Sequence, residues 1–294
     1  MAVHMSGREQ MNTASARRPV AIVTGAGGGM GAACACVLGR RYRLILAELD
    51  AKSLAAVTSS LRRNGTDVIG EVVGDISSQE AIAAVEDHAT QVGGIDALVH
   101  AAGISPFMGS WDRILTVNLG ATLDLLRVVE PHLRPGASAV LIASLGAQIF
   151  PSTPQIDAEL RTVTKSEAVP TLEPLVRSVA TDGEPLSLSN AAYSLSKYAL
   201  MRLCEQRAAR WGAKGARITS VSPGLIATSM GQMEASANPA AAGLAEQAPA
   251  GRWGTANDIA DAVEFLLSDA AGFITGCDLR VDGGLTAYLK DYAT

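Results

Sequence analysis

The sequence predicts an α/β fold in one domain, with a doubly wound parallel sheet of about seven strands. Three observations lead to this prediction. Short β-branched, apolar runs alternate with longer Ala/Leu-rich segments of helical period. The strand-like runs are apolar throughout, which is typical of parallel strands buried on both faces. A glycine-rich turn follows the first run, and 294 residues suit one large α/β domain.

The elements follow in order. Strands are expected at residues 20–24, 43–48, 68–73, 97–101, 139–143, 217–222 and 278–281. Helices are expected at residues 31–41, 51–64, 118–133, 191–211 and 256–267, with shorter ones near 156–163 and 171–179. Asn64-Gly65 is a signal for a helix end, and Ser77 with Glu80 resembles a capping box that opens a further helix. Repeated β-α-β units with right-handed crossovers give a parallel sheet.

Two stretches interrupt this rhythm. Residues 145–190 contain five prolines and no clear strand, so we expect an insertion on the substrate side of the sheet. Residues 229–251 are rich in Gly, Ala and Met, and we expect them to form an irregular lid over the substrate. Residues 1–18 have no continuous apolar stretch and are expected to be a disordered tail, which leaves 19–294 as the domain.

Composition argues against several classes of function. The formal net charge is −5 and no Lys/Arg stripe is present, so no nucleic-acid partner is expected. No run approaches the ~20 apolar residues of a membrane span, and the N-terminus does not resemble a signal peptide. We therefore expect a cytoplasmic protein with no membrane partner. No metal site is expected, and free buried thiols are expected at Cys34, Cys36, Cys204 and Cys277.

A glycine-rich loop joins the first strand to the first helix. Gly25 permits a tight turn, Gly29 lets the backbone approach a pyrophosphate, and Gly31 lets the helix pack closely on the strand. Met30 lies between the last two, where free N–H groups of the helix meet an anion. Such a run can be a simple flexible turn, but the strand–loop–helix context predicts a dinucleotide site and a Rossmann fold.

Glu48 ends the second strand, about 20 residues after the loop, where an acid can bind the ribose hydroxyls of the adenosine. Leu49 follows it at the same edge. A 2′-phosphate would meet this negative charge, and Gly28 offers no basic side chain, so NAD is expected rather than NADP. Asp50 is an alternative acid, and Glu48 can equally be an exposed residue at a strand end.

Tyr193 and Lys197 are four residues apart on an expected helix, so their side chains share a face. A tyrosine has a pKa of ~10, and a nearby ammonium favours the phenolate. We therefore expect Tyr193 to exchange a proton with an alcohol or ketone oxygen. Taken alone, this spacing is common and can mean an aromatic residue packed beside a lysine stem.

Ser144 follows the fifth strand, at the edge where doubly wound folds bind ligands, and its hydroxyl can donate to a substrate oxygen. It can also be a strand-end cap. Asn118 is early in an expected helix, where asparagine is more often a cap. His88, His100 and His132 are scattered and are interpreted as structural or exposed residues.

Together these motifs resemble the short-chain dehydrogenase/reductase family, from about Pro19 to Gly284. The loop matches TGxxxGxG, and Asn118, Ser144, Tyr193 and Lys197 match the catalytic tetrad. The resemblance implies further cofactor contacts, in addition to Tyr193 and Lys197, at Asp75, Ile76, Ala102, Gly103, Pro223, Gly224, Ile226 and Thr228. His100-Ala101 departs from the usual Asn-Asn, and Asn118 is implied to hold a water that links to the lysine.

The spacing between serine and tyrosine is the largest departure from the family, at 193 − 144 = 49 residues. A similar insertion occurs in some bacterial 3α-hydroxysteroid dehydrogenase/carbonyl reductase members. The resemblance implies an NAD-dependent oxidoreductase of secondary alcohols and ketones, and a homo-oligomer, dimer or tetramer, paired through the helices after the fourth and fifth strands.

The lid suggests the substrate class. Its apolar residues suit a bulky hydrophobic small molecule such as a hydroxysteroid: Leu225, Ile226, Met230, Met233 and Leu244. Two alternatives stay open. One is a 3-ketoacyl-thioester reductase of the same fold, which generally prefers NADPH, and the other is a non-catalytic NAD-binding regulator.

Overall fold

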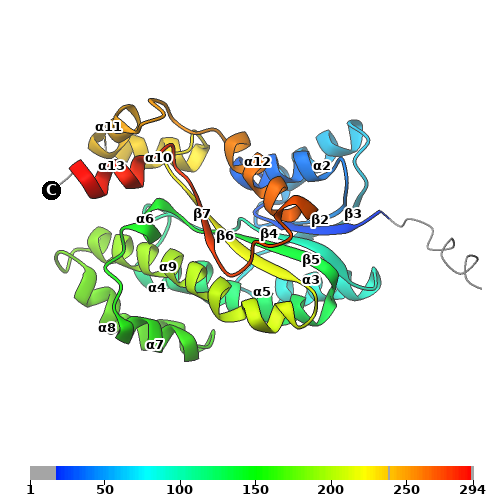
Figure 1. Cartoon of the computed structure of the whole chain (residues 1–294), viewed down its shortest axis with the longest axis horizontal. Helices are drawn as coiled ribbons and strands as arrows, with labels where there is room; N and C mark the ends of the chain where they lie inside the picture. Colours follow the sequence, from blue (N-terminus) through cyan, green and yellow to red (C-terminus); the bar gives the residue numbers. More distant parts are fainter. Residues whose placement is uncertain (1–17, 238, 293–294) are drawn as a thin grey trace, which may run out of the picture.

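Seven apolar runs of the chain form seven strands of one parallel sheet (Figure 1). The computed structural model describes residues 18–237 and 239–292. The strands are β1 (Val20–Thr24), β2 (Arg43–Glu48), β3 (Val68–Val73), β4 (Ile95–His100), β5 (Leu133–Ile142), β6 (Arg217–Pro223) and β7 (Asp278–Val281). Their order is β3-β2-β1-β4-β5-β6-β7, which confirms the predicted fold. The order reverses between β1 and β4, so a crevice opens at the carboxyl ends of these two strands.

Two helical layers cover the sheet (Figure 1). On one face lie α1 (Gly29–Leu38), α2 (Ala51–Arg63) and α12 (Ala256–Leu267), and on the other α3 (Gln79–Gln91), α5 (Ala121–Val129) and α9 (Pro185–Gly212). Each layer encloses its own core, in which Leu38 and Val263 represent the first and Leu125 and Leu200 the second. Burial of both faces of β1 explains why its run is apolar throughout.

The remaining helical segments lie outside these two layers or connect their helices. Before α5 come α4 (Trp111–Ile114) and the π-helical turn η1 (Leu115–Gly120), and after it the 3-10 turn η2 (Glu130–His132). The others are α6 (Leu145–Gln148), α7 (Pro154–Thr162), α8 (Ala168–Val179), α10 (Ser229–Ala237), α11 (Pro239–Gln247), η3 (Asp269–Ala271) and α13 (Leu285–Tyr292).

Several predicted boundaries are wrong. β5 begins at Leu133, six residues earlier than expected, because Leu133 pairs with Ile95 of β4 and an irregularity accommodates Pro135 and Gly136 before pairing resumes at Ser138. The helix expected at 118–133 begins as α4 and passes through η1. The capping residue of α3 is Ser78, whose Oγ accepts from the Ala81 N–H at 3.1 Å, and not Ser77.

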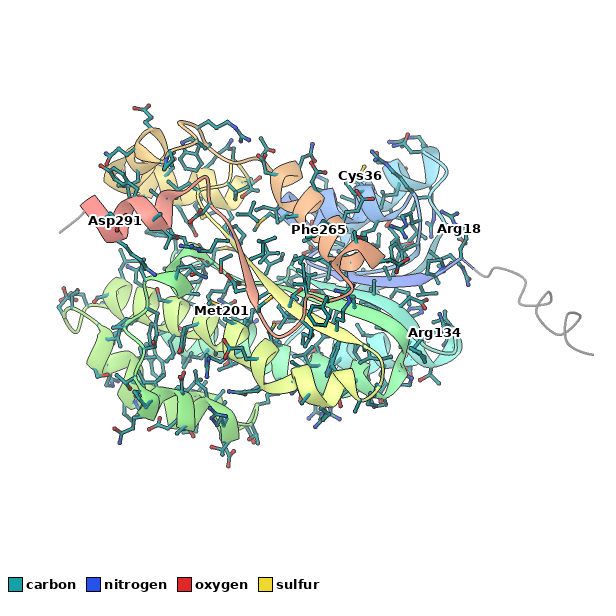
Figure 2. The ribbon with its side chains drawn as sticks, in the orientation of Figure 1. Arg18, Cys36, Arg134, Met201, Phe265 and Asp291 are labelled. Carbon is teal, nitrogen blue, oxygen red and sulfur yellow. The ribbon has the colours of Figure 1, made fainter. Side chains whose placement is uncertain are left out.

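Two further predictions, on the cysteines and on Arg18 of the N-terminal tail, differ from the structure. Cys36 and Cys277 are exposed, so only two of the four cysteines are the buried thiols that were expected. Residues 1–17 of the predicted tail lie outside the described residues. Arg18 is held, since its guanidinium donates to the carbonyl oxygens of Gly39 and Arg40 at 3.2 Å each (Figure 2).

The insertion, residues 145–190, lies mainly against the outer side of α9, away from the sheet (Figure 1). Ile156 and Leu172 are buried there, and the Phe150 ring stacks on Tyr198 at 5.1 Å between centroids. The Tyr198 hydroxyl donates to Asp157 at 2.7 Å. Helices α7 and α8 therefore cover α9 rather than the open end of the sheet, which differs from the expected substrate-side position.

The lid, residues 229–251, is helical over most of its described length and not irregular as predicted, because it forms α10 and α11. Its N-terminal end is held by a short parallel bridge between Ile226 and Gly254. Within residues 18–237 and 239–292, no helix has the length and apolar character needed to cross a bilayer.

Candidate active site

A cleft of about 490 Å³ lies at the carboxyl ends of β1 to β4 and is bordered by the start of α10. Ten of the residues predicted to bind a cofactor line it: Gly25, Gly29, Met30, Glu48, Leu49, Asp75, Ile76, Ala102, Gly103 and Thr228. The sequence analysis missed other lining residues, among them Ile104, Met108 and Arg113. They belong to the loop and helix after β4, for which no motif gave a signal.

The phosphate loop has the shape of an anion cradle. Gly25 has φ +68°, and a Cβ on it would lie 2.7 Å from the backbone nitrogen of Ala102. A Cβ on Gly31 would lie 2.0 Å from the carbonyl oxygen of Gly25, so this glycine serves packing and does not line the cleft. Gly28 is the N-cap of helix α1, so no side chain caps the helix, and its first turn contains no acid. Its N-terminus therefore suits a pyrophosphate.

Glu48 is fixed at the mouth of this cradle. Its Oε2 accepts from the Gly27 N–H at 2.8 Å, and its Oε1 accepts from the Leu49 N–H at 2.8 Å. Asp50, the alternative acid, instead caps α2 by accepting from the Ser53 N–H at 2.8 Å. The structure thus separates the two acids, with Glu48 on the cleft and Asp50 at the helix.

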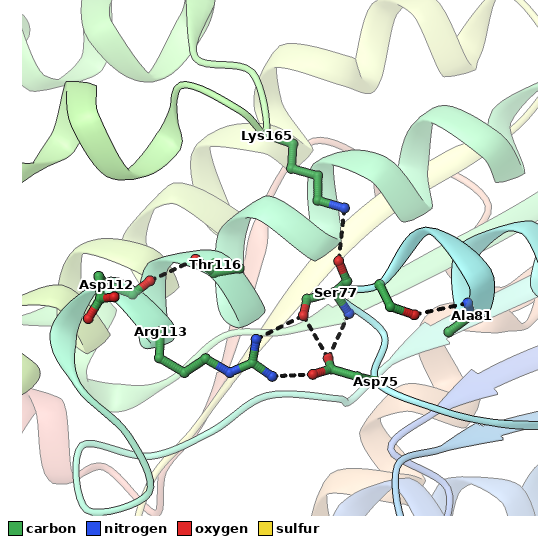
Figure 3. A network of polar contacts seen from close by, with 8 residues as sticks. Asp75, Ser77, Ala81, Asp112, Arg113, Thr116 and Lys165 are labelled. Atoms are coloured by element: carbon green, nitrogen blue, oxygen red, sulfur yellow. Dashed lines mark hydrogen bonds and ion pairs between the residues drawn. The ribbon is translucent and has the colours of Figure 1, made fainter.

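The loop after β3, residues 74–77, borders the far end of the cleft (Figure 3). Asp75 forms a close ion pair with Arg113, and its Oδ1 accepts from the Ser77 hydroxyl at 2.7 Å. Burial acts to raise the pKa of Asp75, but the hydrogen bonds from Ser77 and Arg113 outweigh it and lower that pKa. At this end of the cleft, the charges of Asp75 and Arg113 therefore neutralise each other.

Tyr193 and Lys197 lie on the same face of α9, as predicted. The Lys197 ammonium donates to the carbonyl oxygen of Ile142 at 2.8 Å, and its Nζ lies 5.9 Å from the centroid of the Tyr193 ring. Burial lowers the pKa of Lys197 to about 8. It also raises the pKa of Tyr193 to about 12, with a further increase from Glu234 and an opposing effect from Ser144. The expected lowering of the tyrosine pKa is thus wrong for the protein alone.

Ser144 and Asn118 complete the predicted tetrad. Ser144 caps α6, where its Oγ accepts from the Gly146 N–H at 3.1 Å, and it also acts on the pKa of Tyr193. Asn118 lies within η1 and is 1 % exposed. Its side chain pairs with the backbone of Ile104, accepting at 2.8 Å and donating at 3.0 Å. The absence of a side chain at Gly103 leaves room for the Lys197 ammonium, because a Cβ there would lie 3.3 Å from the Lys197 nitrogen.

His100 is a structural residue, as predicted, and it links the phosphate loop to Asn118. The Thr122 hydroxyl donates to the carbonyl oxygen of Asn118 at 2.7 Å, so its oxygen accepts from His100 Nε2 at 2.8 Å. His100 Nδ1 then accepts from the Thr24 hydroxyl at 2.7 Å. Burial, followed by the charge of Lys197, lowers the pKa of His100 to about 3, which keeps it neutral.

The lid brings one acid to the catalytic residues. Glu234, on α10, interacts electrostatically with Lys197 and Tyr193, and burial raises its pKa. Ser105, which is fully buried, lies beside it and lowers that pKa. The sequence analysis missed both residues, because only the fold brings the lid over the loop after β4.

Other predicted cofactor residues lie outside the cleft lining, and Tyr193 and Lys197 are among them. Pro223 ends β6, and Gly224 packs so closely on Asp282 that a Cβ would lie 2.7 Å from its Cα. Ile226 is buried against Gly254. Among the described residues, no group of three His, Cys, Asp or Glu side chains is arranged to hold a metal.

Comparison with known proteins agrees with this geometry. A family model described as short chain dehydrogenase matches residues 19–153, and one described as Enoyl-(Acyl carrier protein) reductase matches residues 178–286. The 2-(S)-hydroxypropyl-CoM dehydrogenase 3 of Xanthobacter autotrophicus is 32% identical, over 92% of this chain and 98% of that protein. The short-chain dehydrogenase/reductase bsc3 of Alternaria brassicicola is 30% identical, over 92% and 96%. The chain belongs to the short-chain dehydrogenase/reductase family.

A solved structure extends this likeness. The 3-alpha-hydroxysteroid dehydrogenase from a Pseudomonas species, complexed with NADH, has a TM-score of 0.71 and 24% identity, and the match covers 94% of this chain and 99% of that one. At this identity the likeness concerns the fold. Short-chain dehydrogenases/reductases are oxidoreductases that act on alcohols and ketones with a nicotinamide cofactor, and this chain is one of them.

Proposed function

We propose that this short-chain dehydrogenase/reductase transfers a hydride between NAD(H) and a secondary alcohol or ketone, with Tyr193 as its acid and base. The observation that carries the proposal is that Tyr193 and Lys197 lie beside Ser144, and that Lys197 adjoins Gly103, which lines the same cleft as the phosphate loop. The nicotinamide cofactor, when bound, accepts or supplies the hydride. The chain supplies proton transfer, orientation and exclusion of water.

Each catalytic residue has a distinct role. The Tyr193 hydroxyl takes the proton of the alcohol, or returns one to the ketone oxygen. The Ser144 hydroxyl donates to that same oxygen and stabilises its developing charge. Lys197 is held by the Ile142 carbonyl, and its positive charge would act against the burial that raises the pKa of Tyr193. Asn118 holds Ile104 and the water that would link to Lys197, as the family resemblance implies.

Glu48 supports NAD as the cofactor. Its carboxylate lies at the Gly27 N–H, so the ribose hydroxyls would find an acceptor there, while a 2′-phosphate would meet a like charge. Among the described residues that line the cleft, Arg113 is the one cation, and it is paired with Asp75. We therefore expect NADP to bind less tightly than NAD.

A bulky hydrophobic substrate such as a hydroxysteroid is our leading substrate. Met230, Met233 and Met108 line the cleft, which supports an apolar ligand, whereas Ile226 belongs to the core.

A turnover screen tests the proposal. The purified protein is incubated with NAD⁺ or NADP⁺ and with steroid, terpenoid and sugar alcohols, and reduced cofactor is followed by its absorbance. We expect NAD⁺-dependent turnover of an apolar secondary alcohol. Turnover confined to sugars would overturn the substrate proposal, and a preference for NADP⁺ would overturn the cofactor proposal.

A ketoreductase of acyl thioesters is the second candidate. The description of the C-terminal family model names an Enoyl-(Acyl carrier protein) reductase, which shares the acyl-thioester substrate but reduces a carbon–carbon double bond. The same assay distinguishes it, because this candidate predicts NADPH-dependent reduction of a 3-ketoacyl thioester. A non-catalytic NAD-binding regulator is the third alternative. It predicts NADH binding without turnover of any alcohol, although Tyr193 and Lys197 are both present.

A homo-oligomer also remains our proposal. The insertion covers Tyr198 and Arg202 on α9, through the Phe150 ring and the Asp157 carboxylate. Pairing through that part of α9 is therefore blocked, and we expect a dimer formed by other surfaces. Small-angle scattering measures the assembly, and a monomer would contradict this expectation. The cytoplasmic location stays a prediction.

A further inference from the structure

Lys165 of the insertion contacts the loop that borders the cofactor cleft. It lies between α7 and α8, and its side chain extends toward the loop of residues 74–77 (Figure 3). Its Nζ donates to the carbonyl oxygen of Ser77 at 2.9 Å and forms an ion pair with Asp124 at 2.7 Å. The Lys165 and Asp124 side chains are 26% and 18% exposed, so the pair is partly shielded from water.

Gly120 allows this path. A Cβ at Gly120 would lie 3.4 Å from the Lys165 Cγ, so the lysine stem crosses directly over η1. The same turn carries Asn118. Lys165 therefore spans three segments, namely the insertion, the helix that begins with η1, and the loop after β3.

Ser77 connects Lys165 to two residues that line the cleft. Its backbone N–H and its hydroxyl donate to the same Asp75 oxygen at 2.9 and 2.7 Å, and its hydroxyl oxygen accepts from Arg113 at 3.0 Å (Figure 3). Asp75 and Arg113 both line the cleft. Lys165 therefore restricts the movement of Ser77, and Ser77 in turn orients the side chains of Asp75 and Arg113.

We propose that Lys165 is a positioning residue for the adenine end of the cofactor, and that the insertion acts through it as a brace on residues 74–77. This inference rests on the proposed function, in which that end of the cleft takes the adenine. Because the brace holds residues 74–77 in place before the cofactor arrives, less of the binding free energy is spent on ordering this loop. The insertion, which separates Ser144 from Tyr193 by 49 residues, would thereby increase the affinity for the cofactor.

Lys165→Met tests the brace by direct binding. We expect the Kd of NADH, measured by fluorescence, and that of ADP-ribose, measured calorimetrically, to rise about three- to tenfold. The Kd of reduced nicotinamide mononucleotide, which lacks the adenosine, should stay unchanged. At saturating NADH, kcat should also stay unchanged, because Lys165 touches none of the reacting groups. Lys165→Arg keeps the cation and should bind NADH within about twofold of the wild type.

Arg161→Met is the matched control, because it removes an exposed cation of the same insertion. It should leave all three Kd values unchanged. Equal binding by Lys165→Met and the wild type would overturn the brace. A uniform loss of affinity for all three ligands, together with a lower Tm, would overturn it in favour of a general packing role. A wild type that binds no NADH would instead overturn the proposed function itself.

Discussion

The two ends of the cleft differ in how their charges are treated. At the adenine end, Asp75 is surrounded by Ser77 and Arg113, which lower its pKa and stabilise the charged form. At the catalytic end, burial lowers the pKa of Lys197 and raises that of Tyr193, so both charged forms are disfavoured. This difference fits our proposal, in which one end holds the cofactor and the other exchanges a proton, since acid–base chemistry requires a perturbed pKa.

Tyr193→Phe tests the catalytic end most severely. We expect kcat to fall about 100- to 10,000-fold, because the proton donor and acceptor is removed. NADH should still bind, since the adenine end and the phosphate loop are unchanged. Steady-state turnover and fluorescence binding measure the two effects separately. Near-normal turnover would remove Tyr193 from the mechanism.

Ser144→Ala tests the oxyanion contact at the same end. We expect kcat/KM to fall about 100-fold, as when one donor to a developing oxyanion is lost. The cap of α6 is lost as well, which costs about 1 kcal/mol of stability. Ser194→Ala, one residue beyond Tyr193, is the control and should keep its activity. Equal losses in both variants would mean that Ser144 serves packing alone.

His100→Gln tests the link between the phosphate loop and Asn118. The pKa of His100 is about 3 in the folded protein and ~6.5 when unfolded, so only the unfolded chain takes up its proton between these values. This group therefore lowers stability as pH falls from 6.5 toward 3, by up to about 1.4 kcal/mol per pH unit.

The glutamine variant should be about 1–3 kcal/mol less stable at pH 7.5, because a buried hydrogen-bond partner is replaced imperfectly. Its disadvantage should shrink as pH falls to 5, because it lacks the titrating group. Denaturant unfolding at several pH values measures both effects. A difference from the wild type that is constant with pH would contradict the assigned neutral histidine.

Glu234→Gln is the mildest change and tests whether the lid tunes the catalytic end. The Glu234 carboxylate raises the pKa of Tyr193, so its loss should lower that pKa and favour the phenolate. The acidic limb of kcat/KM for alcohol oxidation should move to lower pH, with oxidation at pH 7 about two- to fivefold faster. The exposed Glu246 of α11 provides the control, Glu246→Gln. An unmoved pH profile would confine Glu234 to a packing role.

Local features of the chain could be predicted well. The apolar runs gave all seven strands, and four of them, β1, β2, β3 and β7, have their predicted bounds. The glycine spacing and the i, i+4 pair of Tyr193 and Lys197 also depend on near neighbours, and the structure places Lys197 next to Gly103 of the cleft. The predicted start of β5 failed because an irregularity around Pro135 separates the pairing at Leu133 from the pairing that resumes at Ser138.

The sequence by itself determined the sheet and the glycine-rich loop, because both follow from local patterns of residues, and its resemblance to the family supplied the predicted tetrad. Only the tertiary structure decided that the insertion packs on α9, that Lys165 reaches Ser77, and that Glu234 adjoins Lys197. These contacts join residues dozens of positions apart, which no local period encodes. The direction of each pKa shift was likewise decided by burial, a property of the folded chain and not of the residue type.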